Sequence, residues 1–406
     1  MRGGWGIHGV ERNSALLDTG HMPHMTTSGY AVAGARLADR PADYEALGLP
    51  RRGIALWEDG FRTAPGAPGT WEWWYFDAQL DDGSQLMIVF YAKEVGHEPS
   101  GVSRPFVTLE LDRPDGTRVE TRAVADEGDY AFSTDRCEVR IGASAFSGDL
   151  HDYRIHVEAE DVTADVTLTG STPPWRPGTG HLFFGDDEGR YIAWLPAIPH
   201  GEVEATLRLG GPEAGPDPGG AAGPGQGERL AGHGYHDHTW GDASLAMLVS
   251  HWYRARAAAG PYTVIASHLT AGSRYGHAVV PLFLLTRGGR IIADDGALVY
   301  IHTAGEHDDR DTGRPIADTV VYEYRAVDPA DDGYRVTFSQ DGAAEPASEH
   351  SRGFQHVLAR LAGLEGAYLR FSGRAKIERL SGGQTAEEHS THATWELVYP
   401  GDDDPA

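Results

Sequence analysis

The sequence predicts an all-β protein whose strands are divided between two antiparallel β-barrels in tandem. Most apolar segments alternate with polar residues at a period of two, and few show the 3.6-residue period of a helix. Many of these segments end in Asp-Gly, Asp-Asp-Gly or Gly-Gly, which supply the positive φ values of tight hairpin turns. Because roughly ten to sixteen strands exceed what one twisted open sheet holds, we expect barrels or two sheets.

The expected elements follow one another along the chain. The strands cover residues 84–94, 105–116, 153–161, 164–170, 202–211, 262–270, 279–286, 319–327, 334–342, 367–379 and 393–400. One helix is expected over residues 354–364, FQHVLARLAGL. The Gly- and Pro-rich stretch 210–232 lies between two strand-like segments, so we expect a hairpin loop there rather than a domain linker.

The chain is expected to have three parts. Residues 1–50 have little periodicity and are expected to form a flexible N-terminal arm. Residues 51–243 are assigned to a first barrel and residues 244–406 to a second, since a fresh run of strands begins at residue 245. The length of 406 residues favours two domains over one.

Composition excludes several classes of function. The formal net charge of −26 repels phosphate backbones and anionic lipid headgroups, so we expect neither nucleic-acid nor membrane partners. No apolar run reaches the ~18 residues of a membrane span. The single cysteine, Cys137, excludes an internal disulfide and a cysteine-based zinc cluster, and it is compatible with a cytoplasmic protein. We expect a small-molecule partner and a monomer or homodimer.

A first dense motif, WEWWYF, occupies residues 71–76. On a strand, Trp71, Trp73 and Tyr75 point to one face. Glu72 points to the other face, together with Trp74 and Phe76. The motif is therefore either a barrel strand with a heavy core or one wall of an apolar ligand cavity, with Glu72 as a polar handle.

A second dense motif, GYHDHTWG, occupies residues 234–241. On a strand, Tyr235 and Asp237 share one face, and His236, His238 and Trp240 share the other. Three interpretations remain open. The two histidines could bind a metal with His251 as a third ligand, although no recognised zinc pattern is present. Asp237 and His238 could instead satisfy buried backbone groups, or Tyr235 and Asp237 could serve a cavity as donor and acid.

The two motifs together resemble the carotenoid 1,2-hydratase (hydroxyneurosporene synthase) superfamily, which includes AttH-like proteins and the Diels–Alderases of polyketide biosynthesis. The resemblance covers residues 55–400. It implies two lipocalin-like β-barrels in tandem, no metal and no organic cofactor, and long apolar substrates that are often polyenes. In the hydratases, the tyrosine and aspartate of the Gly-Tyr-x-Asp-His segment are implicated in catalysis, and these fall on Tyr235 and Asp237. The His-x-Trp pair of the hydratases has no match around residues 208–211.

The expected function is a cofactor-free cyclase that closes a ring by [4+2] cyclisation of a linear polyene or polyketide intermediate. The alternatives are a hydratase that adds water to an alkene and a non-catalytic carrier of an apolar molecule. A carboxylic acid buried among tryptophans can stay protonated and polarise a substrate carbonyl. Holding a flexible chain in its reactive conformation contributes ~7 kcal/mol. Such a reaction needs no nucleophile, and the chain has no G-x-S-x-G, P-loop or H-E-x-x-H motif.

The substrate is expected in one cavity, either between the barrels or at the inner mouth of the first. Tyr235 and Asp237 are the expected catalytic residues. The expected substrate-binding residues are Trp71, Glu72, Trp73, Tyr75, His238, Trp240, His251 and Trp252. Cavities of this kind favour barrel mouths and domain interfaces, and both aromatic motifs lie in the first barrel.

Overall fold

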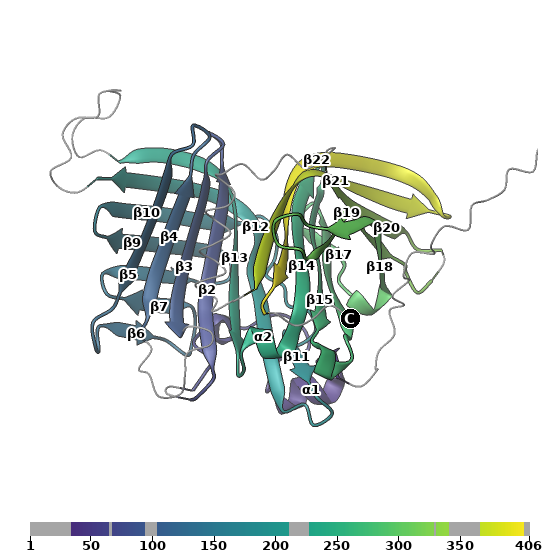
Figure 1. Ribbon diagram of the computed structural model, residues 1–406, viewed down its shortest axis with the longest axis horizontal. Coiled ribbons are helices and arrows are strands. Elements are labelled where there is room, and N and C mark those ends of the chain that lie inside the picture. The colour runs from purple at the N-terminus through teal and green to yellow at the C-terminus, as the bar shows by residue number, and fades with distance from the viewer. Residues whose placement is uncertain are drawn as a thin grey trace, which may run out of the picture.

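The protein folds into two antiparallel β-sheets, one of 13 strands and one of nine, that lie side by side (Figure 1). The computed structural model describes residues 34–64, 67–93, 104–210, 227–328, 330–340 and 366–401. Within them, no helix is long and apolar enough to span a membrane. The prediction of an all-β fold is confirmed.

The first sheet has the order β5-β4-β3-β2-β13-β12-β10-β9-β8-β7-β6, and β11 joins β1 to β12. Its strands are β1 (Ala35–Leu37), β2 (Trp71–Leu80), β3 (Gln85–Lys93), β4 (Phe106–Asp112), β5 (Arg118–Val124), β6 (Tyr130–Phe132), β7 (Glu138–Ile141), β8 (Ser144–Gly148), β9 (Asp152–Ala159), β10 (Val162–Gly170), β11 (His181–Phe184), β12 (Arg190–Leu209) and β13 (Glu228–Gly241).

The second sheet has the order β17-β16-β15-β14-β22-β21-β20-β19-β18. Its strands are β14 (Val249–Ala259), β15 (Tyr262–Ala271), β16 (Val279–Arg287), β17 (Arg290–Ala293), β18 (Val299–Asp308), β19 (Pro315–Tyr324), β20 (Gly333–Gln340), β21 (Ala367–Ser381) and β22 (Gln384–Tyr399). The described helices are short: α1 (Pro41–Ala46), α2 (Leu245–Leu248) and the 3₁₀ helices η1 (Leu56–Asp59), η2 (Ser273–Tyr275) and η3 (Gly296–Leu298).

The chain passes from the first sheet to the second between β13, which ends at Gly241, and β14, which begins at Val249. We keep the domain boundary at residue 243 as a proposal. The stretch 210–232 does not separate the sheets, because β12 and β13 on either side of it are antiparallel neighbours, with Leu207 paired to Glu228. The hairpin predicted there is confirmed, although residues 211–226 lie outside the described residues.

Residues 35–46 are part of the fold, and in this respect the expectation of a flexible arm up to residue 50 is wrong. Strand β1 pairs with β11, so that Ala35 lies opposite Phe184. The Arg36 guanidinium donates to Asp43 in α1 over 2.8 Å and anchors that helix. The helix expected over residues 354–364 lies outside the described residues.

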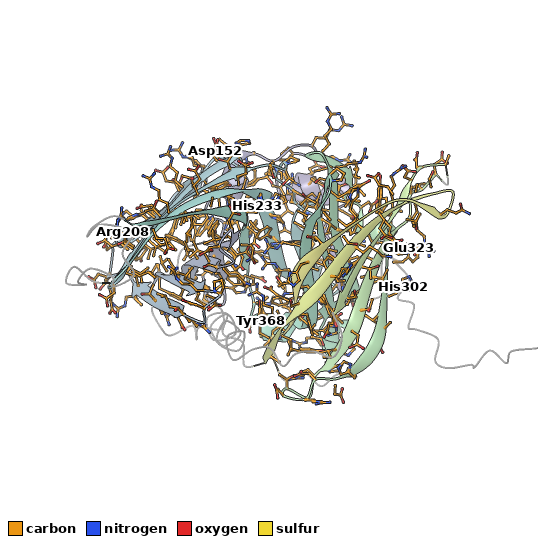
Figure 2. The ribbon with its side chains drawn as sticks, turned by 90° about the horizontal axis from the view of Figure 1, so that it is seen from above. Asp152, Arg208, His233, His302, Glu323 and Tyr368 are labelled. Carbon is orange, nitrogen blue, oxygen red and sulfur yellow. The ribbon has the colours of Figure 1, made fainter. Side chains whose placement is uncertain are left out.

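Apolar side chains form three layers because residues alternate across each strand. Trp74 and Phe76 of β2 lie in the interior of the first sheet, whereas Trp71 and Tyr75 lie in a middle layer between the sheets. A third layer fills the interior of the second sheet. Seen from above, Asp152 and Arg208 lie at one end of the molecule, His302 and Glu323 lie at the other, and Tyr368 of the middle layer lies between them (Figure 2).

Candidate active site

The two motifs identified in the sequence lie on adjacent strands. Strands β2 and β13 pair in an antiparallel register that sets Tyr75 opposite Asp237 and Asp77 opposite Tyr235. The second motif ends in a glycine because a larger residue would clash there. A Cβ atom on Gly241 would lie 2.6 Å from the Trp71 ring. The register thus places two Tyr/Asp pairs side by side on the face that looks toward the second sheet.

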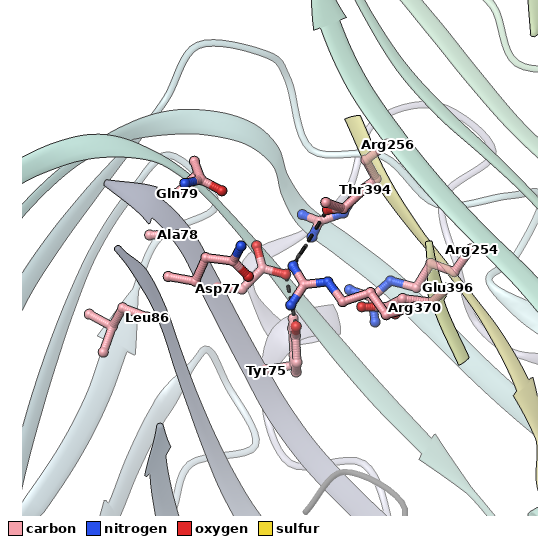
Figure 3. A pocket seen from close by; sticks show the side chains of 11 residues that line it. Tyr75, Asp77, Ala78, Gln79, Leu86, Arg254, Arg256, Arg370, Thr394 and Glu396 are labelled. Atoms are coloured by element: carbon pink, nitrogen blue, oxygen red, sulfur yellow. Dashed lines mark hydrogen bonds and ion pairs between the residues drawn. The ribbon is translucent and has the colours of Figure 1, made fainter. Parts of the chain in front are cut away.

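A small pocket of about 110 Å³ lies between the two sheets at this point (Figure 3). Its lining comes from β2 and β3 on one side and from β14, β21 and β22 on the other: Tyr75, Asp77, Ala78, Gln79, Gln85, Leu86, Arg254, Arg256, Arg370, Thr394 and Glu396. Most of these side chains are polar, whereas the sequence suggested an apolar lining. Among the predicted site residues, Tyr75 lines the pocket.

Each tyrosine donates to the aspartate two residues further along its strand. The Tyr75 hydroxyl donates to Asp77 Oδ2 over 2.8 Å, and the Tyr235 hydroxyl donates to Asp237 Oδ2 over 2.7 Å. The Thr239 hydroxyl donates to Asp237 Oδ1 over 3.0 Å. Two hydroxyl donors converge on this side chain, so Asp237 is placed as a hydrogen-bond acceptor.

Two arginines of β14 complete the charge arrangement. Arg256 forms an ion pair and a hydrogen bond with Asp77. Arg254 Nη2 lies 3.4 Å from Asp237 Oδ2. Burial raises the pKa of Asp77, but the charges of Arg256 and Arg254 outweigh burial and hold it below its usual value. Asp77 is therefore ionised at neutral pH.

The two tyrosines remain neutral donors. Burial and the charge of Asp237 raise the pKa of Tyr235 well above its ordinary value. Burial and the charge of Asp77 do the same for the pKa of Tyr75. The site therefore combines neutral hydroxyl groups, carboxylates and guanidinium groups.

Arg254 differs from its neighbours because it has unused donors. Its Nε and Nη2 atoms are buried and have no hydrogen-bond partner in the described part of the chain. Its guanidinium lies 4.7 Å from the Tyr75 ring centroid and 5.0 Å from the Tyr235 ring centroid. A buried donor without an acceptor lowers the stability of a protein. The Nε and Nη2 donors of Arg254 are therefore available to a hydrogen-bond acceptor on a ligand.

The sequence interpretation missed both arginines, although a signal was present. In HWYRARA, residues 251–257, Arg254 and Arg256 share a strand face with Trp252. Two charged residues on one face of a strand that is otherwise apolar suggest a polar site. Trp252 itself packs, partly buried, against the middle layer.

Trp71 and Trp73 lie in or against the middle layer but outside the pocket lining. Their rings stack with centroids 4.6 Å apart. Trp71 Nε1 donates to the Ala243 carbonyl over 2.7 Å, which satisfies its buried donor. Trp71 therefore holds β2 against the segment that follows β13.

Three other predicted site residues lie on the opposite face, inside the first sheet. Glu72 accepts hydrogen bonds from the backbone amides of Arg62 and Thr63, each over 2.7 Å. His238 Nε2 lies 2.9 Å from Glu72 Oε1, and Trp240 belongs to the same core. The structure does not bring these residues to the pocket.

His251 lies apart from both groups. Its ring centroid is 5.3 Å from that of Tyr399, on the side of β14 that faces the third apolar layer. Burial and the charge of nearby His277 lower the pKa of His251 to about 4. The structure does not bring His251 together with His236 and His238, so the metal triad considered from the sequence is not formed.

Comparison with known proteins identifies relatives. The Diels-Alderase-like family matches residues 64–308. The Diels-Alderase poxQ of Penicillium oxalicum is 23% identical over 352 residues, which cover 81% of this chain and 69% of that protein. Among solved structures, a protein assigned to AttH from Nitrosomonas europaea has a TM-score of 0.53 at 16% identity, covering 87% of this chain and 98% of its own. CghA has a TM-score of 0.52 at 15% identity, and the match covers 85% of this chain and 95% of that chain. These two structures share the fold.

Proposed function

Because the chain belongs to the Diels-Alderase-like family, we propose that it is a cofactor-independent cyclase. Its substrate is a linear, largely apolar polyene or polyketide intermediate of specialised metabolism, and its reaction is a [4+2] cycloaddition. In this reaction three π bonds become one π bond and two C–C σ bonds, and no proton or electron leaves the substrate. We further propose a cytoplasmic monomer or homodimer.

The guanidinium of Arg254 carries this proposal, because its Nε and Nη2 donors make no hydrogen bond within the described part of the chain. In our proposal, its buried Nε–H and Nη2–H groups donate to a substrate carbonyl that is conjugated to the dienophile. Such bonds withdraw electron density from the dienophile and strengthen as negative charge develops on the carbonyl oxygen in the transition state. Asp237 and the faces of Tyr75 and Tyr235 hold the guanidinium in place.

The size of the pocket defines which part of the substrate it takes. A volume of about 110 Å³ is well below the roughly 300–1,000 Å³ of sites that enclose a drug-sized ligand. The pocket therefore receives the polar carbonyl end, and the polyene extends beyond it. Fixing one end of a flexible chain lowers the entropy cost of reaching the folded, reactive conformation.

The test uses a synthetic linear polyene that carries a carbonyl conjugated to its dienophile. We expect the purified protein to convert this polyene to a product of unchanged mass that has lost the polyene absorbance. Liquid chromatography with mass spectrometry measures the conversion. Arg254→Met keeps much of the side-chain volume but removes the donors, so we expect kcat to fall roughly 100-fold. Arg136→Gln is the matched control, because Arg136 is exposed and pairs with the exposed Glu138.

The other outcomes contradict the proposal in distinguishable ways. A product heavier by one water identifies a hydratase, and binding without conversion identifies a carrier. If the wild type is a cyclase but Arg254→Met is as active as the Arg136→Gln control, the proposed function stands. Arg254 then has no role in the reaction.

A further inference from the structure

A second group of chemically reactive side chains lies on the far side of β2 and β13 from the pocket. Asp59, Cys137 and His236 are fully buried, and one ligand atom from each lies within 4.8 Å of the other two. We propose that these three residues bind one zinc ion as a structural site. The proposal is independent of the proposed cyclase activity.

The fold brings the three residues together from distant parts of the chain. Asp59 ends η1, and the segment after it runs along residues 133–136, where the Phe61 amide donates to the Ser133 carbonyl over 2.8 Å. Cys137 directly follows that segment, just before β7. His236 projects from β13 toward the same interior. Zinc would join these three elements.

His236 has the hydrogen bonding of a metal ligand. Its Nδ1 lies 2.9 Å from the Tyr75 carbonyl oxygen, which can only accept, so Nδ1 carries a proton. In the neutral ring Nε2 then has a free lone pair, and it lies 3.4 Å from Asp59 Oδ2. Histidines that bind metals commonly donate their other ring N–H to a backbone carbonyl in this way.

Two buried atoms beside the cluster have no hydrogen-bond partner in the described residues. They are Asp59 Oδ1 and His238 Nδ1, which lie 3.6 Å apart. Glu72 accepts from two backbone amides and the Thr63 hydroxyl, so it is a carboxylate to which His238 Nε2 donates. In the neutral ring, His238 Nδ1 therefore also has a lone pair, directed toward an oxygen. A cation beside Asp59 explains why two electron-rich atoms are buried together.

The ligand chemistry selects zinc. Thiolate, imidazole and carboxylate are its usual ligands, and bond lengths of roughly 2.0–2.3 Å place tetrahedral ligand atoms roughly 3.3–3.8 Å apart. The distance of 3.4 Å between His236 Nε2 and Asp59 Oδ2 falls in this range. One Zn²⁺ balances one thiolate and one carboxylate, so the site is neutral as the surrounding core requires. His238 is the nearest candidate for the fourth ligand.

The surroundings indicate a closed structural site. Rings of Phe146 and Tyr153 lie 4.7 and 4.5 Å from the His236 ring, and the Tyr153 hydroxyl donates to Asp59 Oδ2 over 2.5 Å. None of the three ligands lines the pocket between the sheets. A zinc ion here would stabilise the first sheet and take no part in the reaction.

The first experiment measures metal content. The full chain is produced with a histidine-free affinity tag in zinc-supplemented medium, dialysed against a mild chelator and analysed by inductively coupled plasma mass spectrometry. We expect about one zinc per chain in the wild type, and less than about one fifth of that in Cys137→Ser and His236→Gln. His151→Gln is the control, because His151 is exposed and lies directly before β9 of the same sheet.

A second measurement keeps the proposal testable if the variants do not fold. Wild-type protein refolded with Co²⁺ should show a thiolate-to-cobalt charge-transfer band, which zinc then removes. The proposal is overturned if wild-type protein contains no more metal than Cys137→Ser, or if refolding with Co²⁺ gives no such band. The cluster would then be held by protein hydrogen bonds alone.

Discussion

At the scale of single residues, the site depends on how Asp237 is paired. Its carboxylate accepts from Tyr235 and Thr239 and lies 3.4 Å from the guanidinium of Arg254. This geometry makes Asp237 a positioning residue for Arg254. A proton donor would need a free O–H directed into the pocket, and the hydroxyls of Tyr235 and Tyr75 are both used to hold aspartates.

We therefore predict different effects for the two members of this pair. Asp237→Asn removes the charge that holds Arg254, so kcat should fall by about 10-fold or more. Tyr235→Phe leaves Asp237 and Arg254 in place and should cost less. Steady-state kinetics on the purified variants measure both, with thermal unfolding as a check on folding. If both variants turn over like the wild type while still binding substrate, this pair has no role in the reaction.

At the scale of elements, the 3₁₀ helix η1 depends on one buried ion pair. Arg176 Nε donates to Glu58 Oε2 over 2.7 Å, and both side chains are less than one tenth exposed. The same guanidinium donates to the carbonyls of Gly178 and Pro50, each over 2.6 Å. Arg176 thereby ties η1 to the loop before β11.

Arg176→Ala should destabilise the protein by about 3–5 kcal/mol, because it leaves the Glu58 carboxylate buried without its partner. Urea denaturation of the variant measures this loss as a lower transition midpoint. Arg190→Ala is the control, since Arg190 is more than half exposed and its change should cost less than about 1 kcal/mol. Equal midpoints for the two variants would show that the buried pair contributes nothing.

The elements also show what the sequence could predict. Alternating strands such as β9 and β10 follow directly from their pattern, as does the face on which Tyr235 and Asp237 lie. The first half of β12 was missed, because Pro196 and Pro199 interrupt the pattern and the strand tolerates them only through irregular pairing. Asp59 was missed as well, because its neighbours in space are distant in sequence.

At the scale of the whole molecule, the middle apolar layer joins the two sheets, and histidines are distributed through all parts of this framework. Burial lowers the pKa of His181 and of His200 to about 4. Burial and a neighbouring histidine lower the pKa of His268 to about 3. Together with His251, these groups remain uncharged in the folded protein at pH values where an unfolded chain is protonated.

This distribution predicts a loss of stability in mild acid. An unfolded histidine titrates near 6.5, so below that pH the unfolded chain binds protons that the folded protein does not, until the pH approaches 4. The free energy of unfolding should therefore be a few kcal/mol lower near pH 5 than near pH 7. Aspartates with lowered pKa values do not produce this loss, because they begin to titrate only near pH 4.

Urea denaturation at both pH values measures the effect, and His268→Gln isolates one contribution. Glutamine can still bond to the Tyr322 hydroxyl, which lies 2.9 Å from His268 Nδ1, but it takes up no proton in the unfolded chain. The variant should therefore lose less stability between the two pH values than the wild type, whatever its stability near pH 7. Equal losses in the two proteins would mean that His268 has the same proton affinity folded and unfolded, and that its burial between the strands of the second sheet does not matter to acid stability.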